Sequence, residues 1–149
     1  MRLFRPILSL VLVLVTTLLV SCSSPTQAKI PTVYSPEKVA QLQSYREPIA
    51  LARENMATLK QFIDAENWVN TRTFIHGPLG GLRQEMAAAS RKLLLKDQKT
   101  AQNLAKELFV HFEKIDAAAK DRNVSLVNEQ YAEAIKDFDA YLSLIPTNS

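Results

Sequence analysis

Apolar residues recur at helical spacing through most of this 149-residue chain, and no other feature of the sequence restricts the fold as strongly. From Ser35 onward, four stretches place apolar side chains three or four residues apart, so that each set lines one face of an α-helix. No stretch shows sustained strand alternation or a hairpin turn signal. The pattern predicts an all-α fold: an up-down four-helix bundle at residues 36–146, with an extended N-terminal tether before it and a tail at 147–149.

The first helix is predicted to begin after Ser35, because serine is a good N-cap and Pro36 fits the first helical position. Pro48 lies inside this helix and removes one backbone hydrogen bond. We expect a kinked helix rather than two helices, because the apolar stripe keeps its phase across the proline. That stripe consists of Val39, Leu42, Ile49, Met56, Leu59 and Ile63.

Three further helices are predicted by the same spacing. The second extends from about Asn67 to Leu95, and the third follows Asp97 as its cap. The fourth starts near Ser125 and stops before Pro146. The apolar positions are, for the second, Trp68, Phe74 or Ile75, Leu79, Leu82, Met86 and Leu93; for the third, Ala101, Leu104, Leu108, Phe112, Ile115 and Ala119; for the fourth, Val127, Tyr131, Ile135, Phe138, Leu142 and Ile145.

The predicted second helix contains one irregular point. All three glycines of the chain fall within five residues, and Pro78 stands among them: Gly77, Gly80 and Gly81. One interpretation is a locally unwound turn that presents His76, Trp68 and nearby backbone groups to a partner. The other is a kink that lets the helix pack closely on its neighbours.

The N-terminus has the layout of a bacterial lipoprotein signal. Two arginines precede an uncharged apolar run at 7–20, and Cys22, the only cysteine of the chain, follows where the sequence becomes polar. The run is too short for a membrane span, which needs about 20 apolar residues, and residues 19–22 resemble a lipobox. We therefore predict that residues 1–21 are removed, that Cys22 is acylated and anchors the protein in a membrane, and that 22–35 form an extended linker. The alternative is an ordinary secreted protein with an unmodified cysteine.

The charge balance argues against a nucleic-acid partner. The chain has 18 basic and 15 acidic residues, and loss of Arg2 and Arg5 with the signal leaves a net charge of +1. The calculated pI of 9.1 therefore reflects mainly the signal peptide. With Cys22 acylated, no disulfide or cysteine-based metal site is expected.

Two groups of charged residues are candidate binding surfaces. The densest basic cluster lies at the predicted turn between the second and third helices: Arg91, Lys92, Lys96 and Lys99. These cations could steer docking onto an acidic surface, or they could complement the negative end of a helix. On the fourth helix three carboxylates share one face, either as a site for a cation or basic partner or as an ordinary solvated face: Glu129, Glu133 and Asp137.

Few residues offer catalytic or metal chemistry. His76 and His111 are the only histidines, and they fall on different predicted helices, without the spacing of a metal-binding pair. Adventitious Zn²⁺ binding at either one stays open, although a histidine without a ligand role is the simpler interpretation. The chain has no Cys-x-x-Cys-His haem motif, phosphate-binding glycine loop or nucleophile elbow. We therefore expect neither a cofactor nor an enzyme.

Four short segments of the mature chain, together with the lipobox, resemble the cyanobacterial form of the PsbQ family, which are extrinsic lumenal subunits of photosystem II. The segments are Tyr-Ser-Pro-Glu-Lys at 34–38, Asn-Trp-Val at 67–69, Ile-His-Gly-Pro-Leu-Gly at 75–80 and Asp-Ala-Ala-Ala at 116–119. The resemblance covers essentially the whole mature chain, and Cys22 matches the lipidated cysteine of the cyanobacterial members.

The resemblance implies a non-catalytic subunit on the lumenal side of the thylakoid membrane. Its partners would be the photosystem II core and the other extrinsic lumenal subunits, and its role would be to help retain Ca²⁺ and Cl⁻ at the Mn cluster and to support the dimer. Our candidate docking residues are Trp68, His76, Gly77, Pro78, Arg91, Lys92, Lys96 and Lys99. The alternative is a periplasmic lipid-anchored bundle that binds another protein or a small ligand.

Overall fold

The computed structural model describes residues 31–147, which contain five α-helices and no strand. The helices are α2 (Pro36–Asp64), α3 (Trp68–His76), α4 (Leu82–Lys92), α5 (Leu95–Lys120) and α6 (Val124–Ser143). The expectation of an all-helical fold is therefore confirmed. The predicted signal at 1–21, Cys22 and the linker up to residue 30 lie outside the described residues.

Helix α2 starts as the sequence predicts. The Ser35 hydroxyl accepts a hydrogen bond from the backbone N of Lys38 at 3.2 Å, and Pro36 is the first helical residue. Pro48 lies within the helix, which nevertheless continues to Asp64. The prediction of one helix rather than two is confirmed.

The predicted continuous second helix is wrong, because the structure divides it into α3 and α4. The helix begins where it was expected to, with Asn67 as the N-cap of α3, and the Asn67 side chain accepts from the backbone N of Asn70 at 3.2 Å. Pro78 disfavours helical geometry at the residue before it, so α3 ends at His76 with Gly77 as its C-cap. Residues 77–81 form a turn, and helical structure resumes at Leu82.

The predicted cap of the next helix is also wrong. Helix α5 begins at Leu95, two residues before Asp97, and its N-cap Leu94 has extended geometry without a side-chain cap. The Asp97 carboxylate instead accepts a hydrogen bond from the Tyr34 hydroxyl at 2.8 Å. Helix α6 starts at Val124, where Asn123 caps it by accepting from the backbone N of Leu126 at 3.1 Å.

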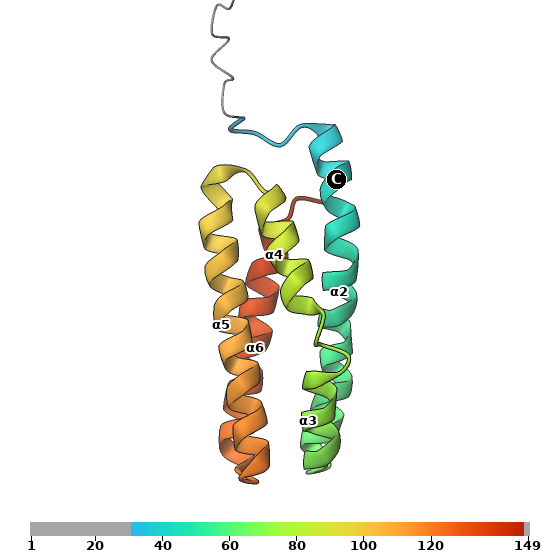
Figure 1. Ribbon diagram of the computed structural model, residues 1–149, viewed down its shortest axis with the longest axis vertical. Helices are drawn as coiled ribbons and strands as arrows, with labels where there is room; N and C mark the ends of the chain where they lie inside the picture. The colour runs from blue at the N-terminus through green and yellow to red at the C-terminus, as the bar shows by residue number, and fades with distance from the viewer. Residues whose placement is uncertain (1–30, 148–149) are drawn as a thin grey trace, which may run out of the picture. The chain divides into compact units, whose positions relative to one another are not determined.

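The helices pack around one apolar core. Figure 1 shows α3 and α4 following one another alongside α2, with α5 beside α6. Contacts link α2 to α3, α4 and α6, and α5 to α3, α4 and α6. Every residue of the core cluster falls between Leu42 and Ile145, so the described residues 31–147 contain a core of their own.

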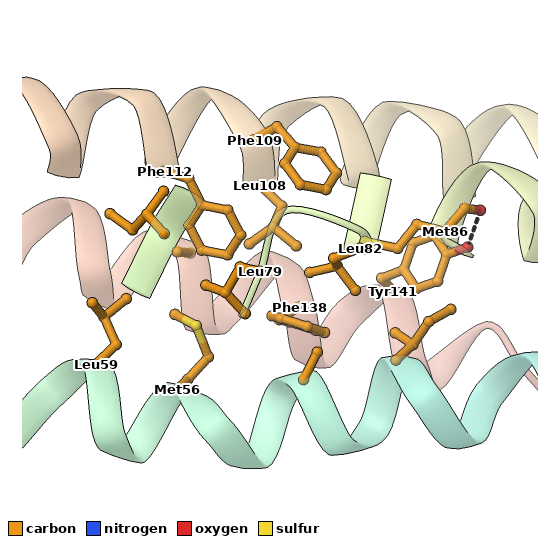
Figure 2. Packing of buried hydrophobic residues seen from close by; sticks show 14 of the residues in the cluster. Met56, Leu59, Leu79, Leu82, Met86, Leu108, Phe109, Phe112, Phe138 and Tyr141 are labelled. Carbon is orange, nitrogen blue, oxygen red and sulfur yellow. Dashed lines mark hydrogen bonds between the residues drawn. The ribbon is translucent and has the colours of Figure 1, made fainter. Parts of the chain in front are cut away.

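A small buried hydrogen-bond network links α4 to α6 within the core. Tyr141 is fully buried, and its hydroxyl donates to the carbonyl oxygen of Met86 at 2.6 Å (Figure 2). The Ser90 hydroxyl donates to the same carbonyl at 2.7 Å. Both buried hydroxyls therefore have partners, as burial requires. Tyr141 was not among the predicted core positions, which placed Leu142 inside instead.

Four long-range hydrogen bonds join α2 to α6 and to the segment that follows α6. The Gln43 side-chain amide donates to the carbonyl of Pro146 at 2.6 Å. Arg53 makes two hydrogen bonds to the Asp139 carboxylate, at 2.7 and 2.9 Å. The Tyr131 hydroxyl donates to the carbonyl of Met56 at 3.0 Å. Rising numbers on α2 pair with falling numbers on α6, so these two helices are antiparallel.

Candidate partner-docking surfaces

The structure divides the eight candidate docking residues between two regions. Trp68, His76 and Gly77 line one open groove, and exposed Pro78 follows directly in the chain. The four basic candidates lie at the turn between α4 and α5. Helix α5 links the two regions, because its first turn belongs to the basic turn and its last turn borders the groove. Its 26 residues correspond to about 39 Å.

Gly80 shows why the segment between α3 and α4 needs glycine. A Cβ atom at Gly80 would lie 2.7 Å from the carbonyl oxygen of His76 and 3.2 Å from that of Gly77. The Gly77 carbonyl also accepts the backbone N–H of Gly80 at 2.9 Å. This tight turn buries Leu79 in the core and leaves the preceding residues 76–78 exposed. The glycine cluster therefore supports core packing as well as an exposed turn.

A charged cluster joins α3 to α5. Arg72 donates to the two oxygens of Asp116 at 3.0 and 3.3 Å, and Nε2 of His76 lies 3.0 Å from Oδ1 of the same carboxylate. Burial alone would raise the pKa of the Asp116 carboxyl, but hydrogen bonds from Arg72 and His76 outweigh it and hold the pKa below its usual range. Asp116 therefore fixes the side chains of Arg72 and His76 next to the groove.

The groove has a volume of about 870 Å³ and lies between the start of α3 and the turn that joins α5 to α6. We call it the α3 groove; its walls are Glu66, Asn67, Trp68, Val69, Arg72, Thr73, His76, Gly77, Ala119, Lys120 and Arg122. Val69 is 75% exposed, and Trp68 is half-buried against the core. The groove combines an apolar surface with three permanent cations and one carboxylate.

Both turns at this end of the structure use the same backbone device. Glu66 and Arg122 have positive φ angles of 49° and 55°, and no other described residue, glycines included, has a positive φ angle. Each is followed by an asparagine N-cap, and each turn closes with paired 6→1 and 5→2 hydrogen bonds. The left-handed conformation is unfavourable for a residue with a Cβ atom, and both residues line the α3 groove.

The four cations of the basic turn, Arg91, Lys92, Lys96 and Lys99, are all exposed. Within residues 31–147 none of them has a carboxylate oxygen within 4.0 Å. Arg91 and Lys92 are the last residues of α4, where cations complement the helix dipole. Lys96 lies in the first turn of α5, where the dipole disfavours a cation, and Lys99 lies in the second turn, where the dipole has little effect. Complementing a helix end therefore explains only half of this cluster.

The segment before α2 is bonded to the basic turn. The Tyr34 hydroxyl donates to Asp97 at 2.8 Å and accepts from the backbone N of Leu94 at 3.2 Å. Partial burial and the neighbouring Asp97 carboxylate raise the pKa of Tyr34 to about 12, so the hydroxyl stays protonated at neutral pH. The basic turn and the start of the helical domain therefore lie at the same end of α5.

The three acidic residues of α6 do not converge on a common site. Oδ2 of Asp137 faces Nε2 of His111 on α5 at 3.4 Å, and Glu133 pairs with Lys136 at 3.4 Å. Burial raises the pKa of Asp137 despite the opposing effect of His111. Glu129 accepts from the side-chain amide of Gln130 at 3.3 Å.

The histidines each have one carboxylate neighbour. Nδ1 of His111 lies 2.8 Å from the side-chain oxygen of Gln130, opposite its contact with Asp137. In the part of the chain that the structure describes, no three His, Cys, Asp or Glu side chains come together as a metal site would require. Each histidine thus offers at most a pair of ligands.

Sequence reasoning missed Arg72 and Arg122, which line the α3 groove, and Asp116, which holds Arg72 and His76 beside it. Arg72 and His76 are four residues apart on one helix, a spacing that places both on one face and could have suggested a shared partner. Asp116 lies 44 residues beyond Arg72, so no short-range sequence pattern indicates that the two side chains pair.

Cys22 lies outside the described residues, and none of the described helices is long and apolar enough to span a membrane.

Comparison with known proteins gives two matches that cover nearly the whole chain. The model of the PsbQ family, described as oxygen evolving enhancer protein 3, matches residues 5–146. The protein named CyanoQ from Synechocystis sp. is 59% identical over 146 residues, which are 97% of this chain and 97% of that relative.

Proposed function

The chain belongs to the PsbQ family of oxygen evolving enhancer proteins, and from this premise we propose that it is a non-catalytic extrinsic subunit of photosystem II on the lumenal side of the thylakoid membrane. The observation that carries this proposal is the 59% identity, which extends over 97% of both chains. We propose further that it supports the dimeric complex and helps to retain Ca²⁺ and Cl⁻ at the Mn cluster.

We propose that the helical domain is an up-down four-helix bundle in which α3 and α4 together take the place of one helix. The antiparallel bonds between α2 and α6 support this assignment. The pairing of Arg72 on α3 with Asp116 on α5 agrees with it.

We propose that acylated Cys22 holds the protein at the membrane. Support comes from the sequence, because the sole cysteine follows an apolar run that is too short to span a bilayer. Several acyl chains bind a bilayer firmly, whereas one chain binds it only marginally. The linker at 22–35 would set the distance from the bilayer at which the helical domain works.

We propose that the α3 groove contacts an acidic segment of a photosystem II subunit that also carries an apolar residue. Arg72, Lys120 and Arg122 outnumber Glu66 along the groove, so its charge favours an acidic partner. Trp68 and exposed Val69 supply the apolar surface that such a contact would bury.

The first test is the intact mass of the native protein that purifies with oxygen-evolving photosystem II particles. The expected mass is that of the chain from Cys22 onward plus acyl groups. Loss of the gene should lower oxygen evolution most in medium depleted of Ca²⁺ and Cl⁻, and adding both ions should restore it. Native protein that is absent from the particles would contradict the assignment, and an unmodified Cys22 would contradict the anchor.

The second test addresses the α3 groove. A Val69→Ser, Lys120→Gln variant should be retained on the particles about tenfold less well, because one apolar and one charged contact together contribute at least 1.4 kcal/mol. The matched control is Leu51→Ser, Lys114→Gln, which alters an exposed leucine on α2 and an exposed lysine outside the groove. Equal retention of the two variants would exclude the groove as the contact.

A different protein client or a small ligand remains a second candidate, because the groove volume falls in the range of small-molecule sites. Cell fractionation separates the two assignments. A location in the periplasm or outer membrane, apart from photosystem II, would favour the second.

A further inference from the structure

We propose that the basic turn, together with residues 31–35, is a contact surface for an anionic lipid bilayer. This surface lies at the end of α5 opposite the α3 groove. The proposal goes beyond the assignment to photosystem II, because it depends on the charges and exposed apolar side chains of the turn itself.

Neither ion pairs nor helix-end complementation within the described chain accounts for all the cations of the basic turn. Neither Lys96 nor Lys99 complements a helix C-terminus, and no carboxylate within the described chain pairs with them. In the described segments at 31–41 and 91–100, the acidic residues are Glu37 in the first turn of α2 and Asp97, which is bonded to Tyr34. Positive charge is therefore in excess here, and an anionic surface would compensate for it.

Apolar side chains project from the same end. The turn contains three consecutive leucines, of which Leu93 and Leu94 are buried in the structure while Leu95 is 61% exposed. Val33, next to the bonded Tyr34, is 77% exposed. Exposed apolar residues flanked by lysines are typical of surfaces that lie in the interfacial region of a bilayer, where the side chains insert between headgroups.

The turn is held in one conformation before any contact. The Gln98 side-chain amide donates to the carbonyl of Leu93 at 2.9 Å and to that of Arg91 at 3.3 Å. Tyr34 bonds to Leu94 and Asp97 from the other side. Because this backbone is already ordered, membrane contact would cost little conformational entropy.

The position of the turn also favours a bilayer over an acidic protein. Tyr34 lies 12 residues after Cys22, so the acyl anchor proposed for Cys22 would keep the turn within about 40 Å of a bilayer. Lysine side chains are flexible point charges, and they suit a fluid layer of headgroups that offers no fixed pairing geometry.

The test uses the chain from residue 22 onward with Cys22→Ser, so that no acyl group mediates binding. Its partition is measured by co-sedimentation with vesicles of phosphatidylcholine alone and of phosphatidylcholine mixed with phosphatidylglycerol. We expect binding to the anionic vesicles only, and loss of that binding at about 0.5 M NaCl, where charges are screened. Absence of binding to the anionic vesicles at low salt would overturn the proposal.

The variant that removes three charges of the turn is Lys92→Gln, Lys96→Gln, Lys99→Gln. A cation near an anionic surface contributes about fivefold to the partition coefficient, so this variant should bind on the order of 100-fold more weakly. The matched control changes three exposed lysines outside both the basic turn and the α3 groove and leaves the same net charge: Lys106→Gln, Lys114→Gln, Lys136→Gln. The control should stay within about threefold of the parent chain.

Leu95→Ser tests the apolar part of the surface and should weaken binding to anionic vesicles several-fold. Because all substituted side chains are exposed, circular dichroism and the urea midpoint should not change. Equal partition of the two triple variants would overturn the proposal. If the variant of the basic turn still binds vesicles but is lost from photosystem II particles, the cluster docks on an acidic protein surface instead.

Discussion

Adding one methyl group at Gly80 tests whether the turn between α3 and α4 depends on close backbone approach. In Gly80→Ala the new Cβ would lie 2.7 Å from the carbonyl oxygen of His76, a separation that real Cβ atoms essentially never show. The obstructing atom belongs to the backbone at the end of α3, so it cannot rotate away as a side chain would. Relief requires a shift of the turn, and with it of buried Leu79.

The neighbouring Gly81 supplies a matched control. A Cβ atom there would meet nothing within 4 Å, and the φ and ψ angles of −80° and −18° are ordinary for any residue. Gly81→Ala should therefore stabilise the fold by about 0.4–1 kcal/mol, because alanine restricts the unfolded chain. Gly80→Ala gains the same entropy but suffers overpacking of about 1–3 kcal/mol. We expect the two variants to differ by roughly 1–3 kcal/mol.

Urea unfolding of the chain from residue 22 onward, followed by circular dichroism, measures this difference. The free energy of unfolding falls by about 1–3 kcal/mol per molar urea, so the midpoint of Gly80→Ala should lie about 1 M below that of Gly81→Ala. If the two variants share the same slope of unfolding free energy against urea concentration, their denatured states expose similar surface. If the two midpoints coincide, steric exclusion at Gly80 does not determine the turn, and the reasoning is refuted.

Two further predictions concern the α3 groove and the Asp116 cluster beside it. Glu66→Gly and Arg122→Gly should each stabilise the fold by about 0.5–1 kcal/mol in thermal unfolding, because glycine removes the left-handed strain; Arg122→Ala keeps that strain and should give no such gain. The pKa of Asp116 is lower in the folded protein than in the unfolded chain. Its contribution to the free energy of unfolding is therefore present above the ordinary pKa of 3.8 and is lost as the pH falls through the lower folded pKa. Asp116→Asn, which breaks the bonds to Arg72 and His76, should therefore flatten the pH dependence of the urea midpoint below about pH 4, and an unchanged acid profile would contradict this.

Local signals in the sequence predicted much of the helical framework. Ser35 and Asn67 are caps because their short polar side chains reach backbone N–H groups within the next turn. The apolar stripe of α2 continues through Pro48 because packing of one face outweighs the loss of one backbone bond. These features depend on residues only a few positions apart, which a pattern can reveal.

The errors arose where distant residues decide the structure. Asp97 looked like a cap, but Tyr34, 63 residues earlier, takes its carboxylate, and the helix starts at Leu95 instead. The stripe through Leu79 suggested one continuous second helix, whereas the tight turn at Gly80 brings Leu79 into the core from a non-helical segment.

For the candidate surfaces too, features set by nearby residues could be predicted and features set by distant residues could not. Exposed lysines and glycines could be picked out individually, and the basic cluster lies at a turn between helices, as predicted. The α3 groove could not be assembled from spacing, because its walls come from α3 and from the α5–α6 turn. Asp116, which joins these elements, has no local partner in the sequence.

The bonds of Tyr34 have a mechanical consequence for a tethered protein. A pull that arrives along residues 31–33 would reach Tyr34, whose hydroxyl is linked to Leu94 and Asp97, 60 and 63 residues further along the chain. Tension would therefore be shared between α2 and α5 rather than peeling α2 away one turn at a time. The domain would therefore respond to such a pull as one folded unit instead of unravelling from its first helix.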